Sequence, residues 1–227
     1  MLSRLADTLV PAAGRLTVTA DADADFAPGG IIAANHTSLA DPAVVLAALH
    51  RLGVQPVVMA TAGLWRIPLL RGALIREGHI PVHRRDRRAA DALDGAAEAL
   101  ARGRLVLIYG EGGLPRREDA AEAAPEAFRS GLSRLVDRTG APVIPLGQAG
   151  ARRVTSGGRV KQLAGVVTAP LRRPALHVHV GAPVVLMGER AARTAQAHAA
   201  VTAAWRTAAG HLGEPAARRD GEPRVPA

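Results

Sequence analysis

Short apolar runs alternate with helical patterns along this chain, and this alternation constrains its fold more than any other feature. The runs stand at residues 31–34, 56–60, 105–109 and 142–146, and helical patterns stand at 42–51, 89–102, 127–139 and 190–209. Runs this short and this apolar are typical of strands that are buried on both faces of a sheet. Strands that alternate with helices predict an α/β fold in which helices flank a largely buried sheet.

The composition favours one domain with a substantial core. Of the 227 residues, 48% are hydrophobic and only 2% are aromatic, so the core must consist mainly of Ala, Val, Leu and Ile. We predict an amphipathic N-terminal helix over residues 1–14, a single domain over 15–210 and a disordered, Pro-rich tail over 211–227. The helix either covers the core or docks on a membrane. The chain has no cysteine, which excludes disulfides and thiolate metal sites and fits a cytoplasmic protein.

The formal net charge of +9 favours an anionic partner, such as a membrane surface, a nucleic acid or a phosphorylated substrate. Genomic bias toward arginine is an alternative explanation, since Lys161 is the only lysine. Nucleic acid is the weakest of the three partners, because the chain has few aromatic residues on which bases could stack. There is no recognisable signal peptide, and the longest apolar region, residues 52–70, contains two prolines, a glutamine and an arginine and is a poor membrane-spanning helix.

A histidine and an aspartate stand five residues apart directly after the apolar run 31–34. Asp41 precedes Pro42 and an apolar segment, which is the pattern of a helix start that Asp caps and Pro opens. An imidazole titrates near neutral pH, and a carboxylate on one ring nitrogen fixes its tautomer and stabilises its protonated form. His36 and Asp41 are therefore a candidate general base for a hydroxyl that attacks a carbonyl. The alternative is a capping aspartate beside a histidine in a polar turn.

Two segments are suited to binding an anion. The run 105–109 leads into a Gly-rich loop with Glu111, Gly112 and Gly113, whose backbone N–H groups could approach an anion or an oxyanion. Arginines crowd residues 84–88, at the start of a predicted helix, where positive charge opposes the helix dipole unless a phosphate is bound. The alternative is that these arginines are simply solvated.

Three other segments have weaker signals. His177 and His179 lie on one face of a predicted strand, and without a third ligand they do not predict a metal site. Residues 64–70 are apolar with one Trp and one Arg, as at a membrane interface or an acyl-chain entrance, or as in a helix packed on the sheet. Residues 147–174 are rich in Gly and Arg, and we predict no regular structure there.

Four segments, in order, resemble the glycerolipid acyltransferases that include 1-acylglycerol-3-phosphate acyltransferase. Residues 35–41 match Asn-His followed by four residues and Asp, 78–84 match Gly-x-Ile-x-Val-x-Arg, 109–114 are similar to Phe-Pro-Glu-Gly-Thr-Arg, and 143–145 match Val-Ile-Pro. In addition to these four, residues 128–131 resemble the Phe-Lys-x-Gly of the family. The resemblance covers residues 30–186 and implies an acyltransferase fold with a mixed, largely buried sheet flanked by helices.

The third motif departs from the family pattern. Its proline is Gly110, its threonine is Gly113 and its arginine is Leu114, while Arg116 follows two residues later. In the family, the second and third motifs hold the phosphate of the acceptor. The chain therefore either shares that task between Arg84 and Arg116 or uses an acceptor other than lysophosphatidate, such as another lysophospholipid, an amino lipid, a glycolipid or a secondary metabolite.

The resemblance implies a single displacement without an acyl-enzyme. His36, oriented by Asp41, would take the proton of a lysophosphatidate hydroxyl, which attacks the thioester of acyl-CoA or of an acyl carrier protein. Ser38 is the only visible alternative nucleophile, and the family does not use it. The residues assigned to the acceptor and its phosphate are Arg84, Glu111, Gly112, Gly113 and Arg116. The backbone N–H groups of Gly112 and Gly113 are also candidates for binding the oxyanion.

The resemblance also implies partners and a location. We expect no cofactor and no metal, with the acyl thioester as co-substrate and a lysophospholipid-type acceptor. We expect a cytoplasmic enzyme that binds peripherally to the anionic inner face of the cell membrane and does not bind nucleic acid. A non-catalytic basic protein that binds lipid or nucleic acid on the same scaffold is the remaining alternative.

Overall fold

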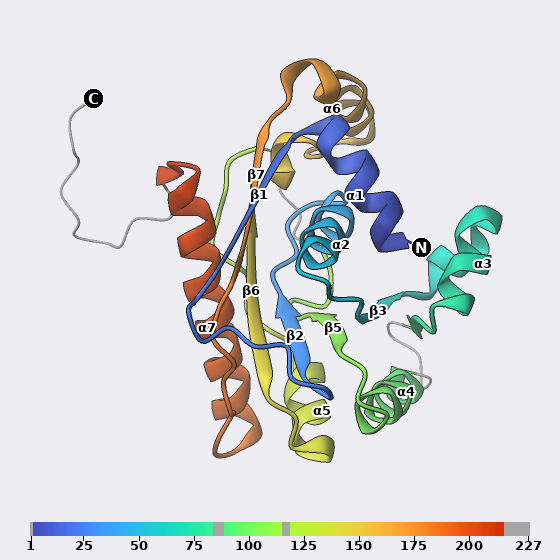
Figure 1. Cartoon of the computed structure of the whole chain (residues 1–227), viewed down its shortest axis with the longest axis vertical. Coiled ribbons are helices and arrows are strands. Elements are labelled where there is room, and N and C mark those ends of the chain that lie inside the picture. The colour runs from blue at the N-terminus through green and yellow to red at the C-terminus, as the bar shows by residue number, and fades with distance from the viewer. Residues whose placement is uncertain (1, 84–88, 115–118, 216–227) are drawn as a thin grey trace.

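The computed structural model describes residues 2–83, 89–114 and 119–215, which form one mixed sheet with helices on both faces (Figure 1). The strands are β1 (Arg15–Ala20), β2 (Ile31–Ala34), β3 (Val57–Thr61), β4 (Ile80–Val82), β5 (Val106–Tyr109), β6 (Val143–Ala149) and β7 (Ala175–Val180). Their order across the sheet is β1-β7-β6-β2-β5-β3-β4. Neighbouring strands run parallel except for β6 and β7, which are antiparallel. The predicted α/β fold with a mixed, largely buried sheet is confirmed.

Helices cover the two faces of the sheet through two separate apolar clusters. The helices are α1 (Leu2–Ala13), α2 (Asp41–Arg51), α3 (Pro68–Arg76), α4 (Ala89–Ala101), α5 (Gly131–Thr139), α6 (Arg159–Arg172) and α7 (Arg190–His211), with 3-10 helices η1 (Ala62–Arg66) and η2 (Ala151–Arg153). One cluster joins α1 and α2 to the sheet, and the other joins α4, α5 and α7 to the opposite face. Strand β2 serves both clusters, because Ile32 faces the first and Ile31 the second.

The core is built mainly from small aliphatic side chains, as the composition predicts, and its buried aromatic side chains in the described part of the chain are Trp205 and Phe128. The backbone of α7 packs directly on β6 at Gly147. A Cβ added to Gly147 would lie 2.1 Å from Ala204 C and Trp205 N, so only glycine fits this approach. The contact places Trp205 against Ala149 in a small third cluster.

Two sequence-based expectations for secondary structure are wrong. Residues 147–174 are not irregular, because β6 continues to Ala149 and α6 spans Arg159–Arg172. The apolar side chains of α6 face outward rather than into the core, so the pattern of the segment gives little sign of a packed helix. The helix predicted over 127–139 begins only at Gly131, because Phe128 is buried in the preceding loop. The predicted tail beyond residue 215 and the arginines at 84–88 lie outside the described residues.

The apolar segment 64–70 forms η1 and the start of α3, and it is mostly exposed. Leu69 is 93% exposed, so this part of the segment does not pack on the sheet. None of the helices in the described part of the chain combines the length and hydrophobicity that crossing a bilayer requires.

Candidate active site

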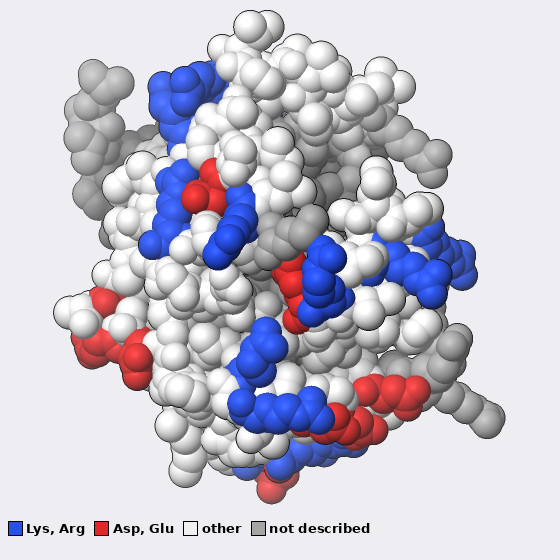
Figure 2. Space-filling model, turned by 45° about the vertical axis from the view of Figure 1, so that its right-hand side comes forward, with Lys and Arg blue, Asp and Glu red and all other residues white. Residues whose placement is uncertain are grey.

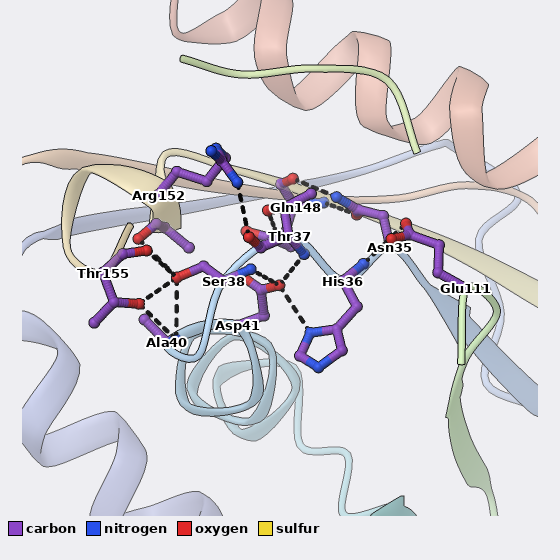
Figure 3. Close-up of polar contacts among 11 residues, drawn as sticks. Asn35, His36, Thr37, Ser38, Ala40, Asp41, Glu111, Gln148, Arg152 and Thr155 are labelled. Carbon is purple, nitrogen blue, oxygen red and sulfur yellow. Dashed lines mark hydrogen bonds and ion pairs between the residues drawn. The ribbon is translucent and has the colours of Figure 1, made fainter. Parts of the chain in front are cut away.

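His36 and Asp41 meet in the turn that joins β2 to α2, at the carboxyl end of the central strand (Figure 3). The imidazole Nδ1 lies 3.0 Å from Asp41 Oδ2. Both side chains are buried, the histidine with a small part of its ring exposed to solvent. Because an ionised carboxylate only accepts hydrogen bonds, Nδ1 carries the proton and Nε2 is left as the basic nitrogen. The pair that the sequence predicts is therefore assembled.

Asp41 does not cap α2 as the sequence predicts. It is the first residue of the helix, and the N-cap residue Ala40 has no capping side chain. Its Oδ2 instead accepts hydrogen bonds from the backbone N–H groups of Thr37, at 2.5 Å, and Ser38, at 2.8 Å. The carboxylate thus folds back onto the turn before the helix and fixes the turn and the imidazole together. Burial raises the pKa of Asp41, and the hydrogen bonds from His36, Ser38 and Thr37 oppose that rise.

The side-chain amide of Asn35 joins the turn to β6 with the pair of hydrogen bonds that a strand backbone would make. Its side-chain amide donates from Nδ2 to the carbonyl of Gln148 at 3.0 Å, and its Oδ1 accepts the N–H of Gln148 at 2.8 Å. The amide therefore extends the pairing of β2 with β6 beyond Ala34, where the β2 backbone ends its ladder. Gln148 in turn donates from Nε2 to the Thr37 hydroxyl at 3.3 Å. The sequence contains Asn35 in a motif but gives no sign of this partner.

A buried arginine supports the turn from the opposite side. Arg152 in η2 donates from Nη1 to the carbonyl of Thr37 at 3.0 Å and from Nε to the carbonyl of Ala121 at 2.9 Å. Its other nitrogen reaches the backbone and side chain of Asp119. Sequence reasoning missed this residue, because a single arginine in a Gly- and Arg-rich segment looks like any solvated one.

Ser38, the alternative nucleophile, is held away from the imidazole (Figure 3). Its hydroxyl is buried against Thr155, where it contacts the Thr155 hydroxyl and lies 2.8 Å from the Thr155 carbonyl. It also lies 3.1 Å from the carbonyl of Ala151. These contacts give Ser38 a structural task, which is to join the turn to the segment after β6.

Glu111 approaches the turn from the Gly-rich loop after β5. Its Oε1 accepts the backbone N–H of His36 at 3.1 Å, while its buried Oε2 has no partner among the described residues. Burial raises the pKa of Glu111 to about 8, and the charge of Asp41 adds to the rise. At pH 7 most molecules therefore carry a proton on this carboxyl. A neutral acid beside His36 can donate a hydrogen bond to a substrate oxygen.

Glycines shape the loop around Glu111. A Cβ on Gly110 would lie 2.4 Å from the Phe128 ring, and Gly112 has φ of +68° with Arg129 Cδ 2.6 Å from its Cβ position. Gly112 N–H donates to the carbonyl of Tyr109 at 3.1 Å, so the prediction that it binds the oxyanion does not fit this geometry. Its N–H closes the turn of the loop instead. Gly113 N–H has no hydrogen-bond partner within the described residues and stays a candidate.

Tyr109 and Arg129 complete the surroundings of the pair. The Tyr109 ring lies against the imidazole of His36, with centroids 4.4 Å apart and planes tilted by 31°. Burial raises the pKa of Tyr109 well above 10, so the phenol stays neutral. Arg129 Nε donates to the carbonyl of Glu111 at 3.3 Å, which brings a guanidinium to the third-motif loop. The two predicted arginines at 84 and 116 lie outside the described residues, and their roles stay predictions.

His177 and His179 take part in a polar ladder between β1 and β7. His177 hydrogen-bonds with Thr17 at 2.7 Å and with Thr19 at 2.9 Å, and its ring stacks on His211 at 3.9 Å. Burial, together with the neighbouring histidines, lowers the pKa of His177 to about 4. Within residues 2–83, 89–114 and 119–215 no group of three or more His, Asp or Glu side chains is arranged to bind a metal.

Comparisons with known proteins agree with one another. The family described as Acyltransferase matches residues 15–148. The 1-acyl-sn-glycerol-3-phosphate acyltransferase of Borreliella burgdorferi is 30% identical over 117 residues, which are 51% of this chain and 44% of that protein, so the match spans less than half of the relative. The crystal structure of the 1-acyl-sn-glycerophosphate (LPA) acyltransferase PlsC from Thermotoga maritima has a TM-score of 0.71 at 16% identity, over 94% of this chain and 79% of that one, and shares the fold.

Proposed function

Because this chain belongs to the Acyltransferase family, we propose that it is an O-acyltransferase of phospholipid biosynthesis. It moves a fatty acyl group from acyl-CoA or an acyl carrier protein to a hydroxyl of lysophosphatidate, 1-acyl-sn-glycerol 3-phosphate. The relative from Borreliella burgdorferi supports this choice of acceptor. The observation that carries the proposal is the 3.0 Å contact between His36 and Asp41 in a turn held from several sides.

The proton transfers follow from the tautomer of His36. Its Nδ1–H donates to Asp41, so Nε2 removes the proton from the acceptor hydroxyl as that oxygen attacks the thioester carbonyl. The carbon–sulfur bond then breaks, and the departing thiolate takes the proton back from Nε2. Asp41 stabilises the imidazolium between these two steps. No cofactor or metal enters this route, since the acyl thioester is itself the activated reagent.

The Gly-rich loop binds the acceptor in this proposal. Gly113 N–H and the protonated carboxyl of Glu111 are donors for oxygens of the reacting groups. Arg84 and Arg116 bind the phosphate, and Arg129, which reaches the same loop, takes the place of the arginine that Leu114 replaces. We also propose that the enzyme works in the cytoplasm, peripherally on the anionic inner face of the cell membrane, where its acceptor lies.

One residue, Leu114, favours a different class of acceptor. Leu114 is apolar where the family carries arginine, which favours a lysophospholipid, an amino lipid or a glycolipid as the acceptor. The chemistry at His36 would be the same. The alternative of a non-catalytic binding protein is disfavoured, because a scaffold that only binds lipid has no use for a buried and oriented His36–Asp41 pair.

The test is an acyl-transfer assay with one labelled acyl-CoA and a panel of lysolipid acceptors, read by mass spectrometry. We expect lysophosphatidate to be the preferred acceptor and His36→Ala to abolish turnover while the protein stays folded. His50→Ala, which removes a partly exposed histidine at the far end of α2, is the matched control and should retain turnover. Wild-type turnover by folded His36→Ala would overturn the mechanism, and preference for another acceptor would overturn the choice of lysophosphatidate.

A further inference from the structure

Helix α6, in the connection between β6 and β7, barely packs against the rest of the molecule. Of its described side chains only Ala169 is buried, and Gly165 approaches the loop below so closely that a Cβ there would lie 2.3 Å from the carbonyl oxygen of Val154. The helix also contains Pro170, which breaks a backbone hydrogen bond. Helices of this length draw most of their stability from burying an apolar face. The described structure offers α6 very little of that burial.

The exposed side of α6 is an apolar stripe. Val160, Leu163, Val167 and Leu171 are between 66% and 88% exposed. At 3.6 residues per turn these positions fall within about 80° of one another, on the side opposite Ala169. Leucines and valines in such a row are what a helix normally turns toward a core. Here they point away from the core.

The neighbouring helix also exposes apolar side chains. Helix α1 contacts α6 and lies beside it in Figure 1, and it exposes Leu5 and Leu9. Figure 2 shows that the top of the molecule, where Figure 1 places α6, is uncharged except for Lys and Arg at its edge. Two helices in contact therefore both expose apolar side chains.

The charged residues of α6 and of the segments on either side of it have one sign. The sequence has no Asp or Glu from Arg138 to Gly188. The guanidinium of Arg172 donates to Thr168 and to the carbonyls of Arg153 and Gly165, and these neutral acceptors leave its positive charge in place. Arg173 likewise donates to a carbonyl, that of Pro11. An apolar stripe bordered by cations fits the acyl–headgroup boundary of an anionic bilayer better than it fits water or a neutral protein surface.

The helix is coupled to the candidate active site through a short segment. The carbonyl of Arg153 accepts from Arg172 of α6, and Thr155 two residues later binds Ser38 in the His36 turn. Leu39, in that same turn, is also exposed. A surface bound by α6 would hold the His36 turn close to it.

We propose that the apolar face formed by α6 together with Leu5 and Leu9 of α1 is the surface by which this chain docks on an anionic lipid bilayer. The inference rests on the proposed function only in that its acceptor is a membrane lipid. Docking through α6 places the His36 turn at the leaflet from which that lipid is drawn. The exposed residues of α3 are not part of this docking surface.

The test is flotation of the full chain with vesicles of phosphatidylcholine, with and without phosphatidylglycerol, at low and high salt. The variant Val160→Gln/Leu163→Gln/Leu171→Gln should lower the partition coefficient for anionic vesicles about a hundredfold. The matched control is Val185→Gln/Met187→Gln, which alters two residues that are similarly exposed but lie outside α6, and it should bind as the wild type does. Single Leu163→Gln and Leu171→Gln variants serve if the triple variant fails to fold, and each should reduce binding.

The outcomes separate docking from catalysis. Wild-type protein that floats with anionic vesicles but transfers no acyl group would refute the proposed function and leave the docking surface standing. Wild-type protein that does not float at low salt, α6 variants that float as the wild type does, or loss of flotation only with Leu69→Gln on α3 would each overturn the docking proposal. So would an α6 variant that dissolves a dimer, measured by light scattering, without changing vesicle binding, because the face would then join two copies.

Discussion

The two loops that meet at His36 are held in opposite ways. The turn 35–41 is tied by side-chain hydrogen bonds to β6 and to the segment that follows it, through Asn35, Arg152 and Thr155. The loop 110–114 takes its shape from glycines, and Glu111 keeps one buried carboxyl oxygen without a partner among the described residues. The polar groups of the turn are therefore paired within the protein, whereas the Gly-rich loop keeps a polar group available for a ligand.

This difference follows from what each loop has to do in the proposed reaction. A general base gains from being fixed before the substrate arrives, because no free energy is then lost in orienting it. A loop that binds a polar head group must instead leave donors and acceptors unused until the ligand pairs with them. Substitutions in the turn should therefore change kcat or stability, and substitutions in the loop should change binding or its dependence on pH.

The largest effect is expected from Asp41→Asn. Thr37 N–H, Ser38 N–H and His36 Nδ1 all bind Oδ2, so the asparagine oxygen can accept from them only if its NH₂ group takes the buried place of Oδ1. The neutral amide no longer stabilises the imidazolium that forms when Nε2 takes a proton, so His36 becomes a much weaker base. We expect kcat to fall about 10³- to 10⁴-fold with little change in acceptor KM. Steady-state kinetics with labelled acyl-CoA measures this, and a fall of less than tenfold in a folded variant would contradict the role of the pair.

Asn35→Ala tests how firmly the turn is held. It removes both hydrogen bonds to the backbone of Gln148, and because these groups are buried, no water replaces the lost partner. We expect the free energy of unfolding to fall by about 3 kcal/mol. Urea denaturation followed by circular dichroism measures it. Thr207→Ala, at an exposed hydroxyl on α7, is the control and should change stability by less than about 0.5 kcal/mol.

Glu111→Gln tests the Gly-rich loop through pH. The carboxyl has a pKa of about 8 in the folded protein against an ordinary value of 4.5, so between these pH values the folded state holds a proton that the unfolded chain has released. Glu111 therefore makes the wild type less stable as the pH rises from 5 to 8, and glutamine removes this contribution. We expect the two proteins to unfold at similar temperatures at pH 5 and the variant to be more stable by about 5 °C at pH 8.

The matched control for that comparison is Glu98→Gln, an exposed carboxylate in an ion pair with Arg102. It should leave the difference between the two pH values as in the wild type. An equal difference for Glu111→Gln and Glu98→Gln would show that Glu111 is ionised in the folded protein, and the Gly-rich loop would then carry a negative charge.

The sequence predicts the local features of the two loops but not their long-range partners. The strands next to them, the meeting of His36 with Asp41 and the Gly-rich shape of the second loop are local features, set by periodicity and by residues close together in the chain. The partners of Asn35, Ser38 and Arg152 are more than 80 residues away from them or in segments without a pattern, and they depend on which strands become neighbours. Sequence reasoning also assigned Asp41 to a cap, because a cap is the commonest use of Asp before Pro. Helix α6 was missed since its apolar residues do not point into the core.

The smallest effect is expected from Arg129→Ala, which tests whether the Gly-rich loop uses this guanidinium for the acceptor phosphate. The side chain is exposed, and within the described residues it donates only to the carbonyl of Glu111, so its loss should leave kcat unchanged and raise KM for lysophosphatidate about tenfold. Arg134→Ala, at an exposed arginine on α5, is the control and should have no effect. Leu114→Arg should lower KM, because it restores a cation to the third motif. If Arg129→Ala raised KM equally for an acceptor without phosphate, the arginine would act by packing on Gly112. The Gly-rich loop would then be held by contacts within the protein, as the turn 35–41 is.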